Sequence, residues 1–145
     1  MNEHKILILL ALLSFMCSGV VMAENHRIIP AVQEMQVGRG ALLLNSSVTV
    51  SYVTELENEA TLLAKYLDED FNIHLEKSVD IEGVIDLCID TDFQSNSKEE
   101  YELVVSDEKV KITSSTAVGV FYGIQTLRQL IVKDKEHLSI PEVYI

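Results

Sequence analysis

The sequence predicts an α/β fold of the α+β type, a two-layer sandwich in which two helices pack on one face of a mainly antiparallel sheet. Two segments carry apolar residues at the 3.6-residue spacing of a helix with one buried stripe. Short segments rich in Val, Ile and Leu surround them, and an acidic pair joins two of these segments as a hairpin. When a sheet and a layer of helices each have one apolar face, packing these two faces against each other removes both from water.

The segments before the first helix are predicted to be strands. Apolar and polar residues alternate over residues 28–37, as in a strand with one covered face. Gly38 and Gly40 predict a turn, after which residues 41–44 form a second short strand. Residues 48–52 are rich in β-branched side chains and predict a third strand.

The first helix is predicted to begin at a capping box and to end near residue 71. The hydroxyl of Thr54 is placed to accept from the backbone three residues on, while Glu57 reaches back. The opposite face of this helix is charged, so we expect only one face to be buried. The buried stripe comprises Leu56, Ala60, Leu63, Ala64, Leu67 and Phe71.

The rest of the chain predicts further strands and a second helix. We expect a strand around His74, another over residues 84–90, and a hairpin of residues 101–106 and 109–113 joined through Asp107 and Glu108.

The second helix is expected over residues 116–132, with Ser114 or Ser115 as its cap. Gly119 and Gly123 lie one turn apart in it. Each costs about 1 kcal/mol relative to Ala, so we expect another backbone to approach closely there. The apolar side of this helix comprises Ala117, Phe121, Ile124, Leu127, Leu130 and Ile131.

A signal peptide, residues 1–23, is predicted to precede a single domain, residues 24–145. Its apolar run, residues 6–15, fits the h-region of a signal peptide and is shorter than the roughly 20 residues that span a bilayer. Val21 and Ala23 suit the −3 and −1 positions of a cleavage site. Bulky Met16 before Cys17 disfavours a lipid anchor. We therefore expect an exported protein, periplasmic or secreted, without membrane attachment after cleavage.

Length and charge exclude several classes of function. A chain of 145 residues suits one domain and has no room for a further catalytic barrel of about 250 residues. The net charge of −12 disfavours nucleic acid as a partner, because phosphates repel an acidic surface. Cys88 is the one cysteine after residue 23, so no internal disulfide is expected, and we interpret it as a small core residue rather than a reactive thiol.

No catalytic, cofactor-binding or metal site is predicted from the residue patterns. The oxygen-bearing side chains after residue 89 alternate as in a calcium loop, but Ser95 and Tyr101 stand where an EF-hand requires Gly and Glu. We interpret this segment as a solvated loop. The side chains concerned are those of Asp90, Asp92, Gln94 and Asn96.

Acid pairs and histidines give no better candidate. Asp68-Glu69 and Asp107-Glu108 are the residue types that glycosidases use, but the first pair lies at the exposed end of the predicted helix and the second at the tip of the predicted hairpin, without an aromatic wall to seat a sugar. We interpret both as surface charge. The histidines after the signal segment have no metal-type spacing; they are His26, His74 and His137.

A run in the last third of the chain resembles a known family. Residues 119–130, Gly-Val-Phe-Tyr-Gly-Ile-Gln-Thr-Leu-Arg-Gln-Leu, follow two strands in a pattern similar to the β-hexosaminidase N-terminal domain. This is the accessory α/β domain that precedes the catalytic barrel in glycoside hydrolase family 20. Ile29-Pro30, Gln33-Glu34 and residues 140–143 match the same family. One departure is Glu108-Lys109, where family hairpins often carry a Gly.

The resemblance implies an exported, non-catalytic domain that supports a barrel through a helix or a sheet edge. The barrel would hydrolyse terminal N-acetylhexosamine residues by a substrate-assisted mechanism. It is the implied partner, and the glycan is contacted only through it. No residue of this chain is assigned to catalysis, and no cofactor is implied.

Two alternatives to the accessory domain stay open, a freestanding secreted carbohydrate-binding or protein-interaction module and a truncated gene product. The absence of Trp, and apolar-periodic positions for most aromatic residues, argue against sugar binding. Arg128 is expected to pair with a carboxylate or to extend along the packed face.

Overall fold

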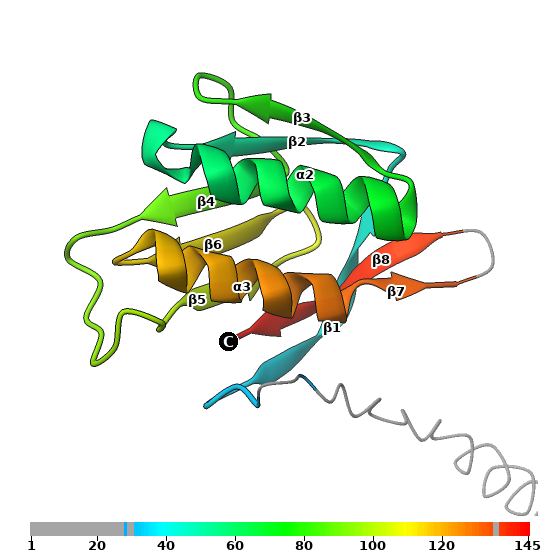
Figure 1. Cartoon of the computed structure of the whole chain (residues 1–145). Helices are drawn as coiled ribbons and strands as arrows, with labels where there is room; N and C mark the ends of the chain where they lie inside the picture. Colours follow the sequence, from blue (N-terminus) through cyan, green and yellow to red (C-terminus); the bar gives the residue numbers. More distant parts are fainter. Residues whose placement is uncertain (1–27, 29–30, 135–136) are drawn as a thin grey trace, which may run out of the picture.

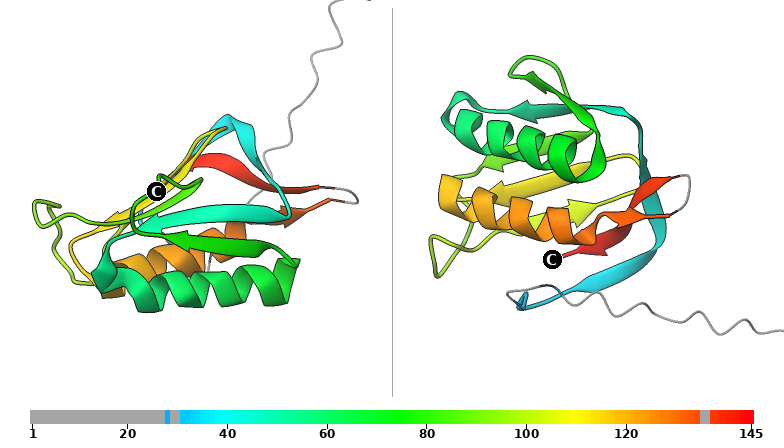
Figure 2. Two further views of the ribbon diagram at one scale, coloured as in Figure 1. Left: turned by 90° about the horizontal axis from the view of Figure 1, so that it is seen from above. Right: turned by 45° about the vertical axis from the view of Figure 1, so that its right-hand side comes forward.

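Two α-helices lie side by side on one face of a twisted sheet in the computed structural model, which describes residues 28, 31–134 and 137–145 (Figure 1). Helix α2 spans Glu57–Phe71 and follows a single 3₁₀ turn, η2, at Thr54–Leu56. Helix α3 spans Ala117–Leu130. Figure 2 shows both helices on the same side of the strands. The predicted two-layer sandwich is confirmed.

The sheet is mixed, with the strand order β1-β8-β5-β6-β4-β2-β3 and with β7 paired to β8. Four of the strand pairs are antiparallel and three are parallel, which agrees with the mainly antiparallel prediction. The parallel pairs join β6, β4, β2 and β3, and β3 lies parallel to β2 because α2 carries the chain from the end of β2 back to the start of β3. The strands are β1 (Gln36–Leu44), β2 (Ser47–Tyr52), β3 (His74–Ser78), β4 (Ile85–Ile89), β5 (Glu102–Val105), β6 (Val110–Ser114), β7 (Val132–Lys133) and β8 (Leu138–Tyr144).

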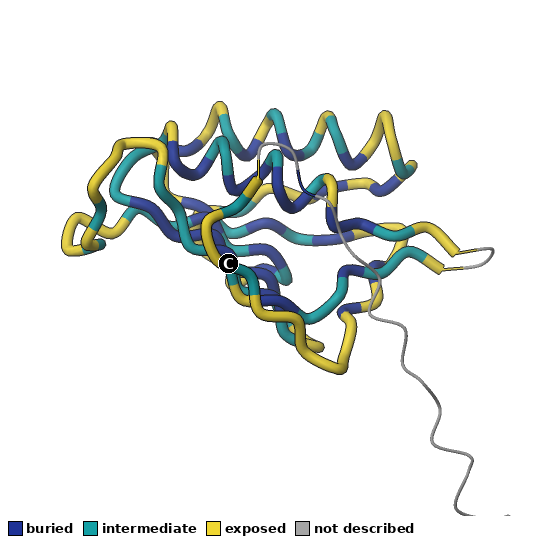
Figure 3. The backbone as a smooth tube through the Cα atoms, turned by 90° about the horizontal axis from the view of Figure 1, so that it is seen from below, coloured by how far each residue is buried: buried dark blue, intermediate teal, exposed yellow. Residues whose placement is uncertain are grey.

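The core fills the space between the helices and the sheet. Figure 3 shows each helix as most buried toward the strands, and the outer side is mainly exposed in α2 and mainly half-buried in α3. Alternate residues of the central strands meet the inner stripes of the helices, and this layer excludes water almost completely. Its largest members include Leu63, Leu67, Ile85, Leu87, Leu103, Ile112, Ile124, Leu127 and Leu130.

One strand runs through both early glycines, so the predicted turn at Gly38 and Gly40 is wrong. Strand β1 pairs with β8 at both of its ends, and the register shifts in the bulge between Val37 and Ala41. The Glu142 carboxylate fills this bulge, where it accepts hydrogen bonds from the backbone N–H of Arg39 at 3.2 Å and of Gly40 at 3.0 Å. A Cβ atom on Gly38 would collide with the same carboxylate. The glycines make room for a side chain instead of reversing the chain.

The strand predicted over residues 28–37 is wrong over residues 31–35, whereas Gln36 and Val37 begin β1. Strand β8 offers hydrogen-bonding partners only from Gln36 onward, so residues 31–35 remain irregular despite their alternation. Ile28 is nevertheless buried in the core. Alternation alone does not form a strand where no partner strand is present.

Both predicted helix starts need correction. Thr54 lies within η2 and makes no capping bond, while Glu57 accepts from the Tyr52 hydroxyl and from the Lys77 ammonium, each at 2.5 Å. Glu57 therefore ties α2 to the sheet rather than closing a capping box. Thr116, not Ser114 or Ser115, caps α3 by accepting from the backbone N–H of Gly119 at 3.1 Å.

The buried stripe of α2 and the hairpin are as predicted. Leu56, Ala60, Leu63 and Leu67 are buried, and Ala64 and Phe71 pack partly buried against the core. Strands β5 and β6 form the expected antiparallel hairpin, closed by a bond from the Ser106 N–H to the Lys109 carbonyl. Neither described helix combines the length and the apolar character needed to cross a bilayer. The predicted signal segment, residues 1–23, lies outside the described residues.

Candidate functional site

Helix α3 is held unusually close to the strands beneath it. A Cβ atom on Gly119 would collide with the Ser114 hydroxyl and with the Glu100 carbonyl, and one on Gly123 would meet the Ile112 side chain. The expected close approach of another backbone is confirmed at Gly119, where the Glu100 carbonyl lies, and is wrong at Gly123, whose near neighbours are the side chains of Ile112 and Tyr101. Gly119 and Gly123 thus allow the short distance between α3 and the sheet. This distance also sets the position of the outer side chains of α3.

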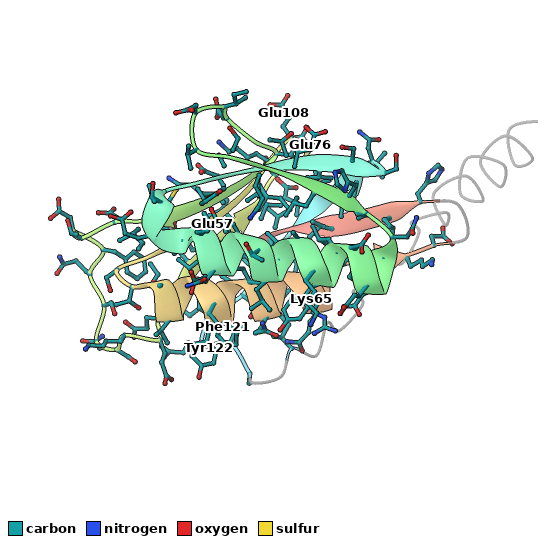
Figure 4. All side chains as sticks on the ribbon, turned by 45° about the horizontal axis from the view of Figure 1, so that its top comes forward. Glu57, Lys65, Glu76, Glu108, Phe121 and Tyr122 are labelled. Atoms are coloured by element: carbon teal, nitrogen blue, oxygen red, sulfur yellow. The ribbon has the colours of Figure 1, made fainter. Side chains whose placement is uncertain are left out.

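The outer side of α3 carries apolar and aromatic residues rather than charges. Val118 is 49% exposed, and Phe121 and Tyr122 are half-buried. The rings of Phe121 and Tyr122 meet edge to face with centroids 5.4 Å apart, and Figure 4 shows them next to each other on the helix. We call Val118, Phe121, Tyr122 and Gln125 the α3 outer face. Phe121 was expected in the core, and this expectation is wrong because its position on α3 lies outside the buried stripe.

Arg128 links the two helices. Its Nε donates to Asp70 Oδ2 at 2.5 Å, and its guanidinium lies 4.2 Å from the centroid of the Tyr66 ring on α2. The pKa of Arg128 is raised, chiefly by the hydrogen bond to Asp70. Both roles considered from the sequence, pairing with a carboxylate and lying along the packed surface, are fulfilled together.

A hollow of about 550 Å³ opens beside the last residues of the chain. It lies between residues 31–34, the loop before β5, helix α3 and the end of β8, near the point marked C in Figure 1. Four aromatic residues line it, namely Phe93, Tyr101, Tyr122 and Tyr144. We call this space the Tyr144 hollow. Because Tyr122 and Gln125 belong to both features, the hollow and the α3 outer face form one continuous surface.

Two tyrosine hydroxyls of the hollow are anchored. The Tyr101 hydroxyl and the Thr126 hydroxyl share a hydrogen bond of 2.5 Å, and burial raises the pKa of Tyr101. The Tyr144 hydroxyl donates to Glu102 Oε2 at 2.6 Å. This bond, with the negative charges of Glu102 and Glu34, raises the pKa of Tyr144. Both phenols are therefore neutral at ordinary pH, and their rings are held in place.

The sequence analysis missed this gathering of aromatic residues. Of the eight aromatic residues after residue 23, only Tyr52 is buried. Phe93 stands in a polar segment without periodicity, and Tyr144 alternates with buried Val143 along β8. Those two signals place both side chains away from the core, but nothing in the local pattern brings them together.

The oxygen-rich segment that was compared with a calcium loop forms local turns. Asp90 Oδ1 accepts from the backbone N–H of Asp92 at 2.9 Å, and the Gln94 side chain donates to the Asp92 carbonyl at 3.1 Å. Within residues 28, 31–134 and 137–145, no three His, Cys, Asp or Glu side chains are grouped so as to hold a metal ion.

The acid pairs and histidines lie apart on the surface. Asp68 and Glu69 are exposed near the end of α2, and Asp107 and Glu108 are exposed at the tip of the hairpin. His74 begins β3, and His137 is exposed just before β8. The remaining one, His26, falls outside the described residues. The structure brings none of the candidates among its described residues together.

Cys88 is half-buried on β4 rather than part of the core. Burial and the neighbouring Asp86 raise the pKa of its thiol. The nucleophilic form of a cysteine is the thiolate, so this environment disfavours reactivity.

The model of glycosyl hydrolase family 20, domain 2, matches residues 25–145. The chain belongs to this family. The resemblance drawn from residues 119–130 is thereby confirmed. Among curated protein sequences, nothing matches the chain.

Solved structures share the fold of this family 20 domain. An inactive mutant of the exo-β-N-acetylglucosaminidase from Vibrio harveyi superposes with a TM-score of 0.70 and 22% identity over 81% of the chain. N-acetyl-β-hexosaminidase from Streptomyces plicatus gives 0.69 and 21% over 85%, and β-N-acetylhexosaminidase from Bacteroides fragilis gives 0.69 and 20% over 83%. The chain spans 18%, 26% and 24% of those three proteins, respectively. At such identities the likeness shows the fold alone.

Proposed function

We propose that this chain is the accessory domain of an exported β-N-acetylhexosaminidase-type glycoside hydrolase, and that it supports a catalytic domain that removes terminal N-acetylhexosamine residues. The observation that carries the proposal is the family match over residues 25–145. The names of the structural neighbours, which are hexosaminidases and an N-acetylglucosaminidase, support the same substrate class.

The α3 outer face is the proposed contact with the catalytic domain. The free energy falls when another surface removes exposed apolar side chains from water. The half-exposed ring of Tyr144 and the half-buried side chain of Ile145 continue this surface across the Tyr144 hollow. Interfaces between domains of one protein bury roughly 600–1,500 Å², which is compatible with a contact that covers one helix face and the adjoining hollow.

A chimera tests this contact. Residues 25–145 replace the matching segment of the Vibrio harveyi enzyme, and the product is assayed on a chromogenic N-acetylglucosaminide. We expect turnover by the chimera and none by residues 24–145 alone. Val118→Glu should lower the melting temperature of the chimera by several degrees and leave that of the isolated domain unchanged.

The matched control for this experiment is Asn58→Glu on the exposed side of α2, which adds the same charge to a helix that we do not place in the contact. Equal melting temperatures for the Val118→Glu and Asn58→Glu chimeras would contradict docking through α3. Hydrolysis by the isolated domain would contradict a non-catalytic role.

Export is the other part of the proposal, and the apolar run over residues 6–15 with Val21 and Ala23 supports it. The N-terminal sequence of protein recovered outside the cytoplasm should begin at Glu24. Protein that retains Met1 in the cytoplasm would contradict export.

A further inference from the structure

The Tyr144 hollow combines aromatic walls with charge of a single sign. Its lining includes four carboxylates and, among the described residues that line it, no Lys, Arg or His. Like charges around one concavity repel each other and favour a cation within it. The carboxylates are those of Glu34, Glu99, Glu100 and Glu102.

Two of these carboxylates act on the hydroxyl of Tyr144. Glu102 accepts the hydrogen bond from the Tyr144 hydroxyl, and the charge of Glu34 also acts on that hydroxyl. Glu100 is engaged elsewhere, because its Oε2 accepts from the backbone N–H of Asn96 at 2.6 Å. A carboxylate has about four acceptor positions, so Glu102 keeps capacity for a further hydrogen-bond donor beside Tyr144, a residue that is 47% exposed.

The same combination of groups already holds a guanidinium elsewhere in this molecule. Between α2 and α3, Arg128 lies over the Tyr66 ring and donates to Asp70. At the hollow, the Tyr144 ring and the Glu34 and Glu102 carboxylates provide the ring and the acceptors. No guanidinium of the described residues lines that space.

A guanidinium suits these groups better than an ammonium or a neutral sugar. It is planar, stacks on an aromatic face and donates up to five hydrogen bonds in a fixed geometry, whereas an ammonium is compact and more strongly hydrated. A neutral sugar would leave the repulsion between the carboxylates uncompensated.

We infer that the Tyr144 hollow receives an arginine side chain of the catalytic domain, stacked on the Tyr144 ring and paired with Glu34 and Glu102. The inference rests on the proposed function, since it names the chemistry that the partner presents next to the α3 outer face. It also assigns the hollow to protein contact rather than to glycan binding.

The test is a titration of isotope-labelled residues 24–145 followed by nuclear magnetic resonance. The probes are N-acetyl-arginine amide, its uncharged isostere N-acetyl-citrulline amide, and N,N′-diacetylchitobiose. We expect N-acetyl-arginine amide to shift the signals of Tyr122, Tyr144 and Glu102, with a dissociation constant on the order of 10 mM. The citrulline compound and the disaccharide should give no comparable shift at equal concentration.

Two double variants with the same change in net charge distinguish binding of the arginine probe in the hollow from its general attraction to an acidic protein. Glu34→Gln with Glu102→Gln should weaken binding of the arginine probe at least about threefold. Glu76→Gln with Glu108→Gln should leave it unchanged, because both side chains are exposed and lie away from Tyr122 (Figure 4). Retained amide spectra establish that both variants are folded.

Four outcomes would overturn the inference. The first two are equal weakening of arginine-probe binding in both double variants and no binding of that probe at all. The third is tighter binding of the disaccharide than of the arginine probe at the same residues. The fourth is a higher affinity for the arginine probe in Arg27→Gln, which would mean that the chain's own arginine fills the hollow. The melting temperature of the Val118→Glu chimera tests the proposed function separately, since Val118 does not line the hollow.

Discussion

Helices α2 and α3 have nearly the same length and lie in the same layer, yet their outer sides differ. Helix α2 carries six charged residues, and all but one of them are exposed, whereas α3 carries Arg128 alone. Both inner stripes are buried against the sheet. The outer side of α2 is charged, as expected for a surface in water, while the outer side of α3 leaves Val118 exposed and the rings of Phe121 and Tyr122 only half-buried. The difference supports the proposal that a further protein surface covers α3.

The two helices are also fastened in different ways. Polar side chains tie the start of α2 to the sheet, through Glu57 to Tyr52 and Lys77. Close contact at Gly119 and Gly123 fixes α3. A substitution at Gly119 should therefore act through steric fit, and a substitution at Glu57 through charge.

The largest expected effect separates the two sides of α3. Leu127→Ala removes a fully buried side chain and should cost about 2–5 kcal/mol of unfolding free energy. Phe121→Ala removes an edge-to-face ring contact at the surface and should cost about 0.5–1.5 kcal/mol. Urea denaturation of the isolated domain measures both. Equal losses would show that Phe121 belongs to the core after all.

An intermediate effect is expected from adding one methyl group to α3. Gly119→Ala should destabilise the domain by about 1–3 kcal/mol, because the new Cβ collides with Ser114 and the Glu100 carbonyl. This loss outweighs the gain of about 1 kcal/mol that Ala brings to a helix interior. Asn58→Ala, at an exposed position of α2, is the control and should change stability by less than about 0.5 kcal/mol. A Gly119→Ala domain more stable than the parent would refute the close approach.

The smallest effect concerns the polar link at the start of α2. Hydrogen bonds from Lys77 and Tyr52 lower the pKa of Glu57 below its usual 4.5. A group whose pKa is lower in the folded state stabilises the fold above its unfolded pKa, and this contribution is lost as the pH falls through the folded pKa. Glu57→Gln should therefore lower the melting temperature at pH 7 and reduce the further loss between pH 7 and pH 3.

Glu76→Gln is the control for this pH dependence, since Glu76 is an exposed β3 carboxylate. Its melting temperature should follow that of the parent domain at both pH values. A Glu57→Gln domain with the full acid sensitivity of the parent would show that the link contributes nothing.

Features that depend on neighbours in the chain were predictable from the sequence. The stripe from Leu56 to Leu67 places apolar side chains on one side of any regular helix, and the segments around Asp107 and Glu108 have only to fold back on each other. The family was likewise predictable from one run of twelve consecutive residues, 119–130, and the family match agrees with it. Such local patterns do not depend on contacts with distant parts of the chain.

The sequence by itself therefore determined the layers, the main helices and strands, and the family. Only the tertiary structure determined that Gly38 and Gly40 lie within a strand and that Thr116 caps α3. It also determined that aromatic residues gather around Tyr144. The carboxylate that occupies the β1 bulge belongs to Glu142, 103 positions from the Arg39 backbone that it binds. Local periodicity reports contacts within a few residues, whereas bulges, caps and hollows depend on which distant segments the sheet places side by side.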